Sequence, residues 1–292
     1  MNSSTEDNNP QQQGLPERYT DPRLAAHIYF LPNLMTAGNL FFGFTAIIFC
    51  VNALLAKHGI AIAGDIQSAT DLYRLAIGCI IASVLCDALD GRFARMGGRE
   101  SLFGKEFDSI ADIVSFGLAP ALMVFFEILA DPNVQTPRVR TAAGVIAFIY
   151  LLCGAIRLAR FNVITHPITV KEGKFATSDF LGLPVPAAAG AVCSLLVLIN
   201  SEALSESTLP WVRMALPYLL LGIAILMVST IPFPSFKKPK PTGLRPLKLA
   251  LALCIAALTL IYWQVGLPCI FFGYIAFSVI RAAKNLPKKS GN

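Results

Sequence analysis

Apolar residues occur along this chain in long blocks that are separated by short polar connectors. A membrane-spanning helix needs about 20 mostly apolar residues, and eight of the blocks approach that length. These blocks cover residues 31–55, 75–95, 108–130, 142–161, 183–200, 212–231, 247–264 and 266–283. The pattern predicts an all-α, polytopic integral membrane protein with about eight transmembrane helices.

The polar segments at the ends of the chain and between the apolar blocks indicate how the chain is divided into tails and membrane domains. Residues 1–20 are polar and are predicted to be a disordered cytoplasmic tail, and residues 21–231 are predicted to form the main membrane domain. The final two blocks meet at residues 264–266, a connection short enough to predict an antiparallel helical hairpin within 232–283. A basic cytoplasmic tail, 284–292, is expected to follow.

The composition supports a membrane protein and excludes several other classes. Apolar residues make up 55% of the chain and charged residues only 14%, whereas an average soluble protein carries about 25% charged residues. A disordered chain, a coiled coil and a disulfide-rich secreted domain do not fit these values. The 7 cysteines lie inside apolar blocks and form no CxxC pair, so neither disulfides nor a zinc site are predicted.

Most of the 24 Lys and Arg residues fall on one side of the predicted spans. Basic residues gather in the cytoplasmic loops of membrane proteins, so both termini are predicted to be cytoplasmic. The expected location is a bacterial-type cytoplasmic membrane. The net charge of +6 suits contact with anionic lipid headgroups. The basic residues form no single stripe, which argues against nucleic acid as a partner.

Four aspartates lie where two consecutive spans meet the cytoplasmic side: Asp87, Asp90, Asp108 and Asp112. An ionised side chain at the centre of a membrane helix costs about 2.5–3.5 kcal/mol on insertion scales, so four such groups close together need neutralising partners. Asp87 and Asp90 share one helix face, and Asp108 and Asp112 share a face of the next helix. The short connector predicts that these two helices pack as antiparallel neighbours with their acidic faces together.

Facing carboxylates indicate a metal site, because carboxylate oxygens are ligands that Mg²⁺ and Mn²⁺ prefer. Four of them suit two ions, and two-metal sites usually serve phosphoryl or pyrophosphoryl chemistry. Gly91 and Ala94 on the acidic face would let a ligand approach the backbone closely. The alternative is an interfacial acidic cluster that only balances basic residues of the connector, such as Arg92 and Arg99. Four acids on two matched faces favour the metal site.

These residues resemble the signature of the CDP-alcohol phosphatidyltransferases. The match reads Asp87-x2-Asp90-Gly91-x2-Ala94-Arg95-x8-Gly104-x3-Asp108-x3-Asp112, which is eight fixed positions over 26 residues. The resemblance implies an integral membrane enzyme whose six-helix catalytic core lies within 21–231, followed by two extra C-terminal spans. It implies that a phosphatidyl group passes from CDP-diacylglycerol to an alcohol and that CMP is released.

The resemblance also implies roles for individual residues. Asp87, Asp90, Asp108 and Asp112 would bind two divalent cations, Mg²⁺ or Mn²⁺, and Asp112 would also act as the general base. The positions implied to bind CDP-diacylglycerol are Asn33, Thr36, Gly91, Ala94, Arg95 and Ser101. Asn39 departs from many relatives, which have an arginine there, and no role is assigned to it.

Three further segments resemble the membrane-integral phosphatidylserine synthases, a branch of this family: residues 115–120, 157–162 and 180–186. This branch implies L-serine as the acceptor. Arg157, Arg160 and Asn162 are then candidate serine-binding residues, because the planar arginine fork binds a carboxylate well. The alternative is that both arginines extend to lipid headgroups and only orient their helix.

The expected mechanism is a metal-dependent direct displacement. Asp112 would accept the proton of the serine hydroxyl as the hydroxyl oxygen attacks phosphorus, and no Ser, Cys or His constellation suggests a covalent enzyme intermediate.

Expected partners are CDP-diacylglycerol, L-serine, the lipid bilayer and, as a candidate homodimer, a second copy of the chain. Two other functions stay open. One is a sister enzyme that uses glycerol 3-phosphate, inositol phosphate or choline, and the other is a divalent cation transporter.

Overall fold

Helices form nearly all of the structure. The computed structural model describes residues 30–60, 68–96, 102–130, 136–164, 180–201, 203–205, 207–234 and 262–284. The α-helices are α3 (Phe30–Lys57), α4 (Ala69–Met96), α5 (Leu102–Asp112), α6 (Ala119–Leu129), α7 (Pro137–Ile164), α9 (Val185–Ile199), α10 (Leu209–Val228) and α12 (Trp263–Lys284). A π-helix, η1 (Ile113–Leu118), joins α5 to α6, and two short strands, β1 (Phe180–Leu181) and β2 (Pro232–Phe233), pair antiparallel.

Six segments of the described structure are long and apolar enough to cross a membrane. They are Pro32–Lys57, Ala69–Phe93, Phe103–Leu129, Pro137–Ile164, Leu209–Val228 and Trp263–Lys284, and α9 is a shorter apolar helix. These segments confirm the prediction of an all-α polytopic membrane protein. The predicted span at 247–264 lies outside the described residues except for 262–264, so the count of eight stays a prediction. Residues 1–29 and 285–292 also lie outside; they include the predicted N-terminal tail and all of the predicted C-terminal tail except Lys284, which ends α12.

One predicted boundary is wrong. The sequence predicts a turn at residues 264–266, whereas these residues form the first turn of α12, which begins at Trp263. The backbone N–H groups of Val265 and Gly266 donate to the carbonyl oxygen of Tyr262. A single glycine does not end a helix within an apolar run, because its cost there is only about 1 kcal/mol. The last span therefore starts earlier than the sequence predicts.

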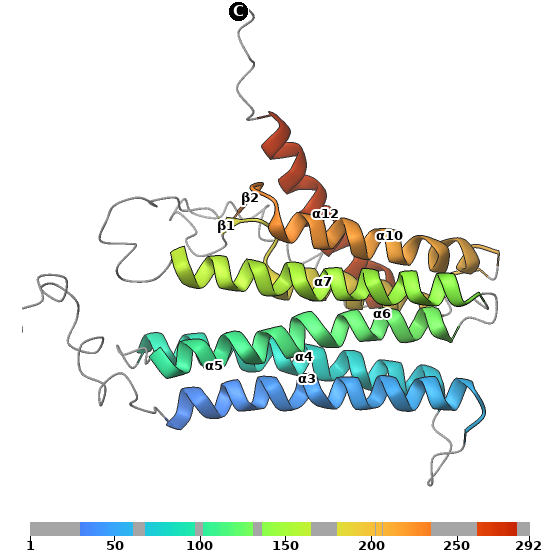
Figure 1. Ribbon diagram of the computed structural model, residues 1–292, viewed down its shortest axis with the longest axis horizontal. Helices are drawn as coiled ribbons and strands as arrows, with labels where there is room; N and C mark the ends of the chain where they lie inside the picture. Colours follow the sequence, from blue (N-terminus) through green and yellow to red (C-terminus); the bar gives the residue numbers. More distant parts are fainter. Residues whose placement is uncertain are drawn as a thin grey trace, which may run out of the picture.

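The helices run side by side along the long axis of the molecule, and α12 leans away from the others (Figure 1). α3 packs along α4, α7 along α10, and α9 against α12. Most side chains of α9 are buried. Phe271 of α12 packs onto Gly190 of α9, where an added methyl group would lie 2.3 Å from the ring. The missing side chain at Gly190 therefore lets α12 approach α9 closely.

The third span changes helix type directly after Asp112. η1 covers residues 113–118, and Pro120 follows in the first turn of α6. Proline has no N–H group, so the carbonyl oxygen of Phe116, four residues earlier, loses its usual α-helical donor. The buried Tyr150 hydroxyl on α7 donates to this oxygen instead, at 3.2 Å. A helix irregularity thus lies beside Asp112, and a neighbouring helix satisfies the backbone group that it leaves unpaired.

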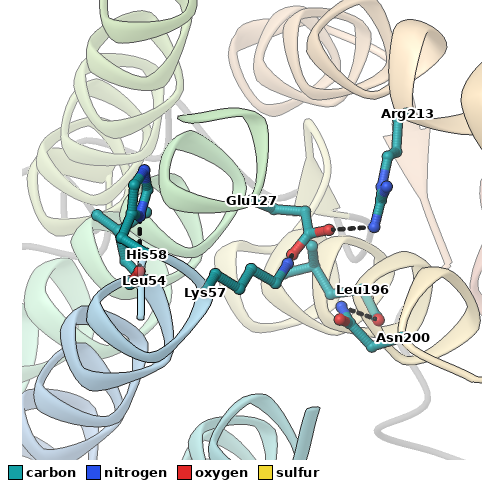
Figure 2. Close-up of polar contacts among 7 residues, drawn as sticks. All are labelled: Leu54, Lys57, His58, Glu127, Leu196, Asn200 and Arg213. Carbon is teal, nitrogen blue, oxygen red and sulfur yellow. Dashed lines mark hydrogen bonds and ion pairs between the residues drawn. The ribbon is translucent and has the colours of Figure 1, made fainter. Parts of the chain in front are cut away.

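A buried ion-pair cluster joins three helices at the end of the bundle where α3 and α6 finish. The Glu127 carboxylate on α6 is 1% exposed and lies 2.8 Å from the Lys57 Nζ atom on α3. On its other side it lies 3.3 Å from a terminal nitrogen of Arg213 on α10. Figure 2 shows the carboxylate between these two cations. The cluster therefore ties α3, α6 and α10 together far from the aspartates.

Glu127→Leu is expected to lower the free energy of unfolding by about 3 kcal/mol, because it leaves two mostly buried cations without their anion. Denaturant unfolding of the purified protein in detergent measures the loss. The matched control is Asp71→Asn, since Asp71 forms an exposed pair with Arg74 in which the side chains are 54% and 49% exposed. Exposed pairs contribute about 0–1 kcal/mol. Equal stability of the two variants would contradict the role given to Glu127.

Candidate active site

Helix α3 lies beside the acidic site and packs against both helices that carry the aspartates. Asp87 and Asp90 lie on α4, and Asp108 and Asp112 lie in the second half of α5. α3 packs against α4, α5 and η1, whereas the backbones of α4 and α5 scarcely meet in the described parts of the chain. The prediction that the acidic faces of these two helices lie together is confirmed, although most of their backbone packing is with α3. Their acidic faces meet through side chains, with α3 holding both helices in place.

Three of the four aspartates converge, as the helical spacing predicts. One carboxylate oxygen each from Asp87, Asp108 and Asp112 lies within 4.8 Å of the other two. Asp112 is buried, and Asp87 and Asp108 are half-buried. Asp90 is also buried, accepts a hydrogen bond from the Thr36 hydroxyl on α3, and interacts electrostatically with Asp87. The structure thus groups three predicted ligands and places Asp90 next to them.

The convergence of Asp87, Asp108 and Asp112 fits divalent cations. Carboxylates this close repel one another, and the repulsion is costly at the end of a membrane span. A hard cation between them removes this cost, and Mg²⁺ and Mn²⁺ both take carboxylate oxygens as ligands. Asp87, Asp108 and Asp112 would hold such ions, and Asp90 would add a carboxylate from α4.

Asn39 is a site residue to which the sequence patterns assigned no role. Its side chain is fully buried, and its amide nitrogen donates to Oδ1 of Asp112 at 3.1 Å. Ser83 on α4 donates to the Asn39 side-chain oxygen, and Ser115 on η1 donates to the Asn39 backbone carbonyl at 2.9 Å. The signal that could have identified Asn39 is an amide side chain near the middle of an apolar span, because such a group needs hydrogen-bond partners in a membrane.

The residues predicted to bind the CDP-lipid are only partly placed. The Asn33 amide nitrogen is buried and has no hydrogen-bond partner among the described residues. A methyl group added at Gly91 would meet no described heavy atom within 4 Å. Ala94 and Arg95 belong to the last turns of α4, and Ser101 lies outside the described residues. Asn33 thus has a buried donor without a described partner, and Gly91 has open space beside its Cα atom.

The three predicted serine-binding residues lie on the last turns of α7 but have different surroundings. Arg157 is 8% exposed, and its Nε atom is buried with no hydrogen-bond partner in the described part of the chain. Its guanidinium interacts electrostatically with Asp112. Arg160 is half-buried, and the Asn162 amide donates to the Ser109 hydroxyl on α5 at 2.9 Å. Arg157 is therefore close to the acidic site, and Asn162 connects α7 to α5.

An apolar groove with a volume of about 640 Å³ lies between α3 and the η1–α6 segment. Its lining residues are Ala37, Leu40, Phe41, Phe44, Ile47, Val114, Leu118 and Leu122. The groove begins one residue after Thr36 and follows α3 away from the aspartates for about 15 Å, at 1.5 Å per residue. Because its lining is entirely apolar, the groove suits a hydrocarbon chain whose polar end lies at the acidic site.

Comparisons with known proteins show which family the chain is similar to. The family model described as CDP-alcohol phosphatidyltransferase matches residues 29–227. The chain is 32% identical over 260 residues to a Helicobacter pylori protein named CDP-diacylglycerol–serine O-phosphatidyltransferase, a match that covers 87% of this chain and 91% of the relative. A Methanocaldococcus jannaschii protein of the same name is 32% identical over 202 residues, 69% of this chain and 83% of the relative. An archaetidylserine synthase from Methanothermobacter thermautotrophicus is 30% identical over 206 residues, 70% of this chain and 69% of the relative.

Proposed function

Because this chain belongs to the CDP-alcohol phosphatidyltransferase family, we propose that it transfers the phosphatidyl group of CDP-diacylglycerol to the hydroxyl group of L-serine and releases CMP. The names of the relatives support serine as the acceptor, since they include CDP-diacylglycerol–serine O-phosphatidyltransferases and an archaetidylserine synthase. The reaction requires a site for the pyrophosphate, a base for the acceptor hydroxyl and a cation for the amino-acid carboxylate.

One observation carries the proposal: Asp112 interacts electrostatically both with its acidic neighbours Asp87 and Asp108 and with Arg157. The carboxylate of serine is attached to the carbon next to the one that bears the hydroxyl. A base for the hydroxyl and a cation for the carboxylate must therefore serve the same site, and Arg157 is the cation of α7 that interacts electrostatically with Asp112. The buried Nε atom of Arg157, which has no hydrogen-bond partner in the described structure, remains available to donate to that carboxylate.

In the proposed reaction, Asp112 accepts the proton of the serine hydroxyl as the hydroxyl oxygen attacks the phosphorus atom attached to diacylglycerol. The bond between this phosphorus and the bridging oxygen of the pyrophosphate breaks, and CMP leaves. Arg157 binds the serine carboxylate and thereby orients the hydroxyl toward Asp112. When bound by the four aspartates, two divalent cations would neutralise the pyrophosphate and the charge that develops on the leaving CMP.

The CDP-lipid is proposed to bind along α3 and the end of α4. Asn33 donates to the nucleotide part, the backbone at Gly91 lies against it, and one acyl chain occupies the apolar groove beside α3. Arg95 and Ser101 belong to this proposal because they match the family signature. Arg160 and Asn162 are proposed to flank the serine site on α7.

The proposed location is a bacterial-type cytoplasmic membrane, with both termini and the acidic site on the cytoplasmic side. The aspartates lie at the end of the bundle where α3 begins and where α4 and α7 finish. Connectors predicted to lie at this end contain most of the Lys and Arg residues, as expected for cytoplasmic segments.

The function is tested by CMP release from CDP-diacylglycerol, measured on the full chain in lipid nanodiscs with Mn²⁺ or Mg²⁺. L-Serine, glycerol 3-phosphate, inositol phosphate and choline are compared as acceptors. CMP release that requires L-serine and yields phosphatidylserine supports the proposal, and release with a different acceptor alone overturns it. A flux of Mn²⁺ into protein-containing vesicles without CDP-diacylglycerol, with no CMP release under any condition, would indicate a transporter instead.

Arg157→Lys is expected to raise the KM for serine by about 10-fold, because lysine keeps the charge but loses the planar fork that binds a carboxylate. The KM for CDP-diacylglycerol should change little. Steady-state CMP release at varied serine concentrations measures the effect. Arg138→Lys, at the exposed opposite end of α7, is the matched control and should leave both KM values unchanged. An unchanged serine KM in Arg157→Lys would remove Arg157 from the serine site.

A further inference from the structure

Asn39 is a fully buried polar side chain within an apolar span, and its hydrogen bonds extend to two other helical segments. Its amide nitrogen donates to Oδ1 of Asp112 on α5, and its side-chain oxygen accepts from Ser83 on α4. A buried amide without such bonds is costly in a membrane. Each end of the Asn39 amide is therefore held by a different helix.

The two bonds of the Asn39 side chain permit only one orientation of its amide. A flipped amide would place the Asn39 oxygen against a carboxylate oxygen of Asp112, where two acceptors would face each other. The Ser83 hydroxyl donates to the Asn39 oxygen and thereby supports the orientation in which the amide nitrogen faces Asp112. Asn39 thus offers Asp112 a donor in a fixed direction.

The backbone around Asn39 is fixed against the segment that follows Asp112. Ser115, three residues after Asp112, donates to the Asn39 carbonyl oxygen at 2.9 Å. Gly43, one turn after Asn39 on α3, makes this approach possible, because an added methyl group would lie 2.1 Å from the Ser115 hydroxyl oxygen and 2.7 Å from its Cα atom. The close contact between Gly43 and Ser115 sets the position of Asn39 relative to Asp112.

We propose that Asn39 is a positioning residue for Asp112, and that Ser83 acts through Asn39. The Asn39 amide holds Oδ1 of Asp112, which leaves the other carboxylate oxygen to receive the proton of the acceptor hydroxyl. This inference rests on the proposed function, in which Asp112 is the base. Asn39 touches neither the substrate nor the reacting atoms, and its effect reaches the reaction only through the orientation of the carboxylate.

The test is a double-mutant cycle that combines Asn39→Leu with Asp112→Asn. Asn39→Leu alone is expected to lower kcat by about 10- to 100-fold, since a misplaced catalytic group can cost that much. The KM values for serine and CDP-diacylglycerol should change by less than about threefold, because the binding residues remain in place. In the double variant, kcat should lie within about twofold of the kcat of Asp112→Asn alone. The effects of two residues that act through one another are not additive.

Two measurements keep a folding defect apart from a positioning effect. The rate is expressed per molecule of folded protein, counted as the monodisperse fraction in size-exclusion chromatography, so that misfolded protein does not lower it. Asn200→Leu is the matched control, since among the described residues the Asn200 amide donates to the Leu196 carbonyl of the adjoining helix α9 alone, and kcat should be unchanged. If Asn39→Leu does not purify as a folded protein, Ser83→Ala replaces it in the same cycle, with an expected loss of about 3- to 10-fold.

Additive losses in the cycle, or a kcat within twofold of the wild type in the single variant, would overturn the role of Asn39. An inactive wild-type protein with serine would instead overturn the proposed function itself. The two failures are therefore distinguishable in one set of assays.

Discussion

Replacing Asp108 by asparagine is expected to lower CMP release by about 10³-fold or more, even at saturating substrate concentrations. Asparagine keeps the size of the side chain and removes one of the three charges whose oxygens lie within 4.8 Å of one another. A metal clamp supplies several kcal/mol of transition-state stabilisation, and each 1.36 kcal/mol lost costs about a factor of ten in rate. The affinity for Mn²⁺, measured by direct binding without turnover, should fall together with the rate.

Glu106→Gln provides the matched control for Asp108→Asn. Glu106 lies on the same helix, two residues earlier, and its side chain is exposed. Its neutralisation removes the same charge from α5 without touching the convergent carboxylates, so activity and Mn²⁺ affinity should stay near those of the wild type. Near-normal turnover of Asp108→Asn at high Mn²⁺ would show that Asp108 is not a metal ligand.

Asp112→Asn is expected to lower kcat by about 10²- to 10⁴-fold, the usual cost of losing a general base. Asparagine preserves the shape beside Asn39 and Arg157, but it cannot accept the proton of the acceptor hydroxyl and it removes one negative metal ligand. Binding of CDP-diacylglycerol should largely survive, because Asn33, Thr36 and Gly91 are unchanged. Single-turnover CMP release measures the chemical step, and equilibrium binding of labelled CDP-diacylglycerol measures the complex.

Serine concentration separates a lost base from a weakened serine site. In Asp112→Asn the rate should remain low when serine is raised, whereas in Arg157→Lys added serine should restore most of the rate. A turnover within tenfold of the wild type in Asp112→Asn would place the general base on another residue. Recovery at high serine would mean that Asp112 contributes to serine binding rather than to proton transfer.

Helical periodicity predicted which aspartates share a helix face, because residue spacing determines which side chains point the same way. Asp108 and Asp112 are four residues apart and point the same way, and Asp87 meets them from α4. The sequence could not show that α3 holds α4 and α5 in place, since α3 has no acidic residue and its packing depends on contacts between distant segments.

Three features lay beyond sequence patterns for distinct physical reasons. The π-helical turn after Asp112 continues an apolar run, so only the missing N–H of Pro120 gave a local signal of it. The hydrogen-bond partners of Asn39, Ser83 and Asp112, are separated from it by 44 and 73 residues, so no local pattern connects them. The start of α12 was misplaced because the glycine at position 266 indicated a turn, although the surrounding apolar residues continue the helix.

The Glu127 cluster also bears on how the chain enters the membrane during synthesis. Segments fold from the N-terminus onward, and Lys57 on α3 precedes Glu127 on α6, which precedes Arg213 on α10. Lys57 ends its helix and can extend to the interface while it has no anion. Glu127 therefore enters the bilayer with a cation already present, and Arg213 enters opposite a carboxylate already in place. With this order of charges along the chain, no charge is buried in the bilayer without a partner during insertion. An unpaired charge there has a high free-energy cost.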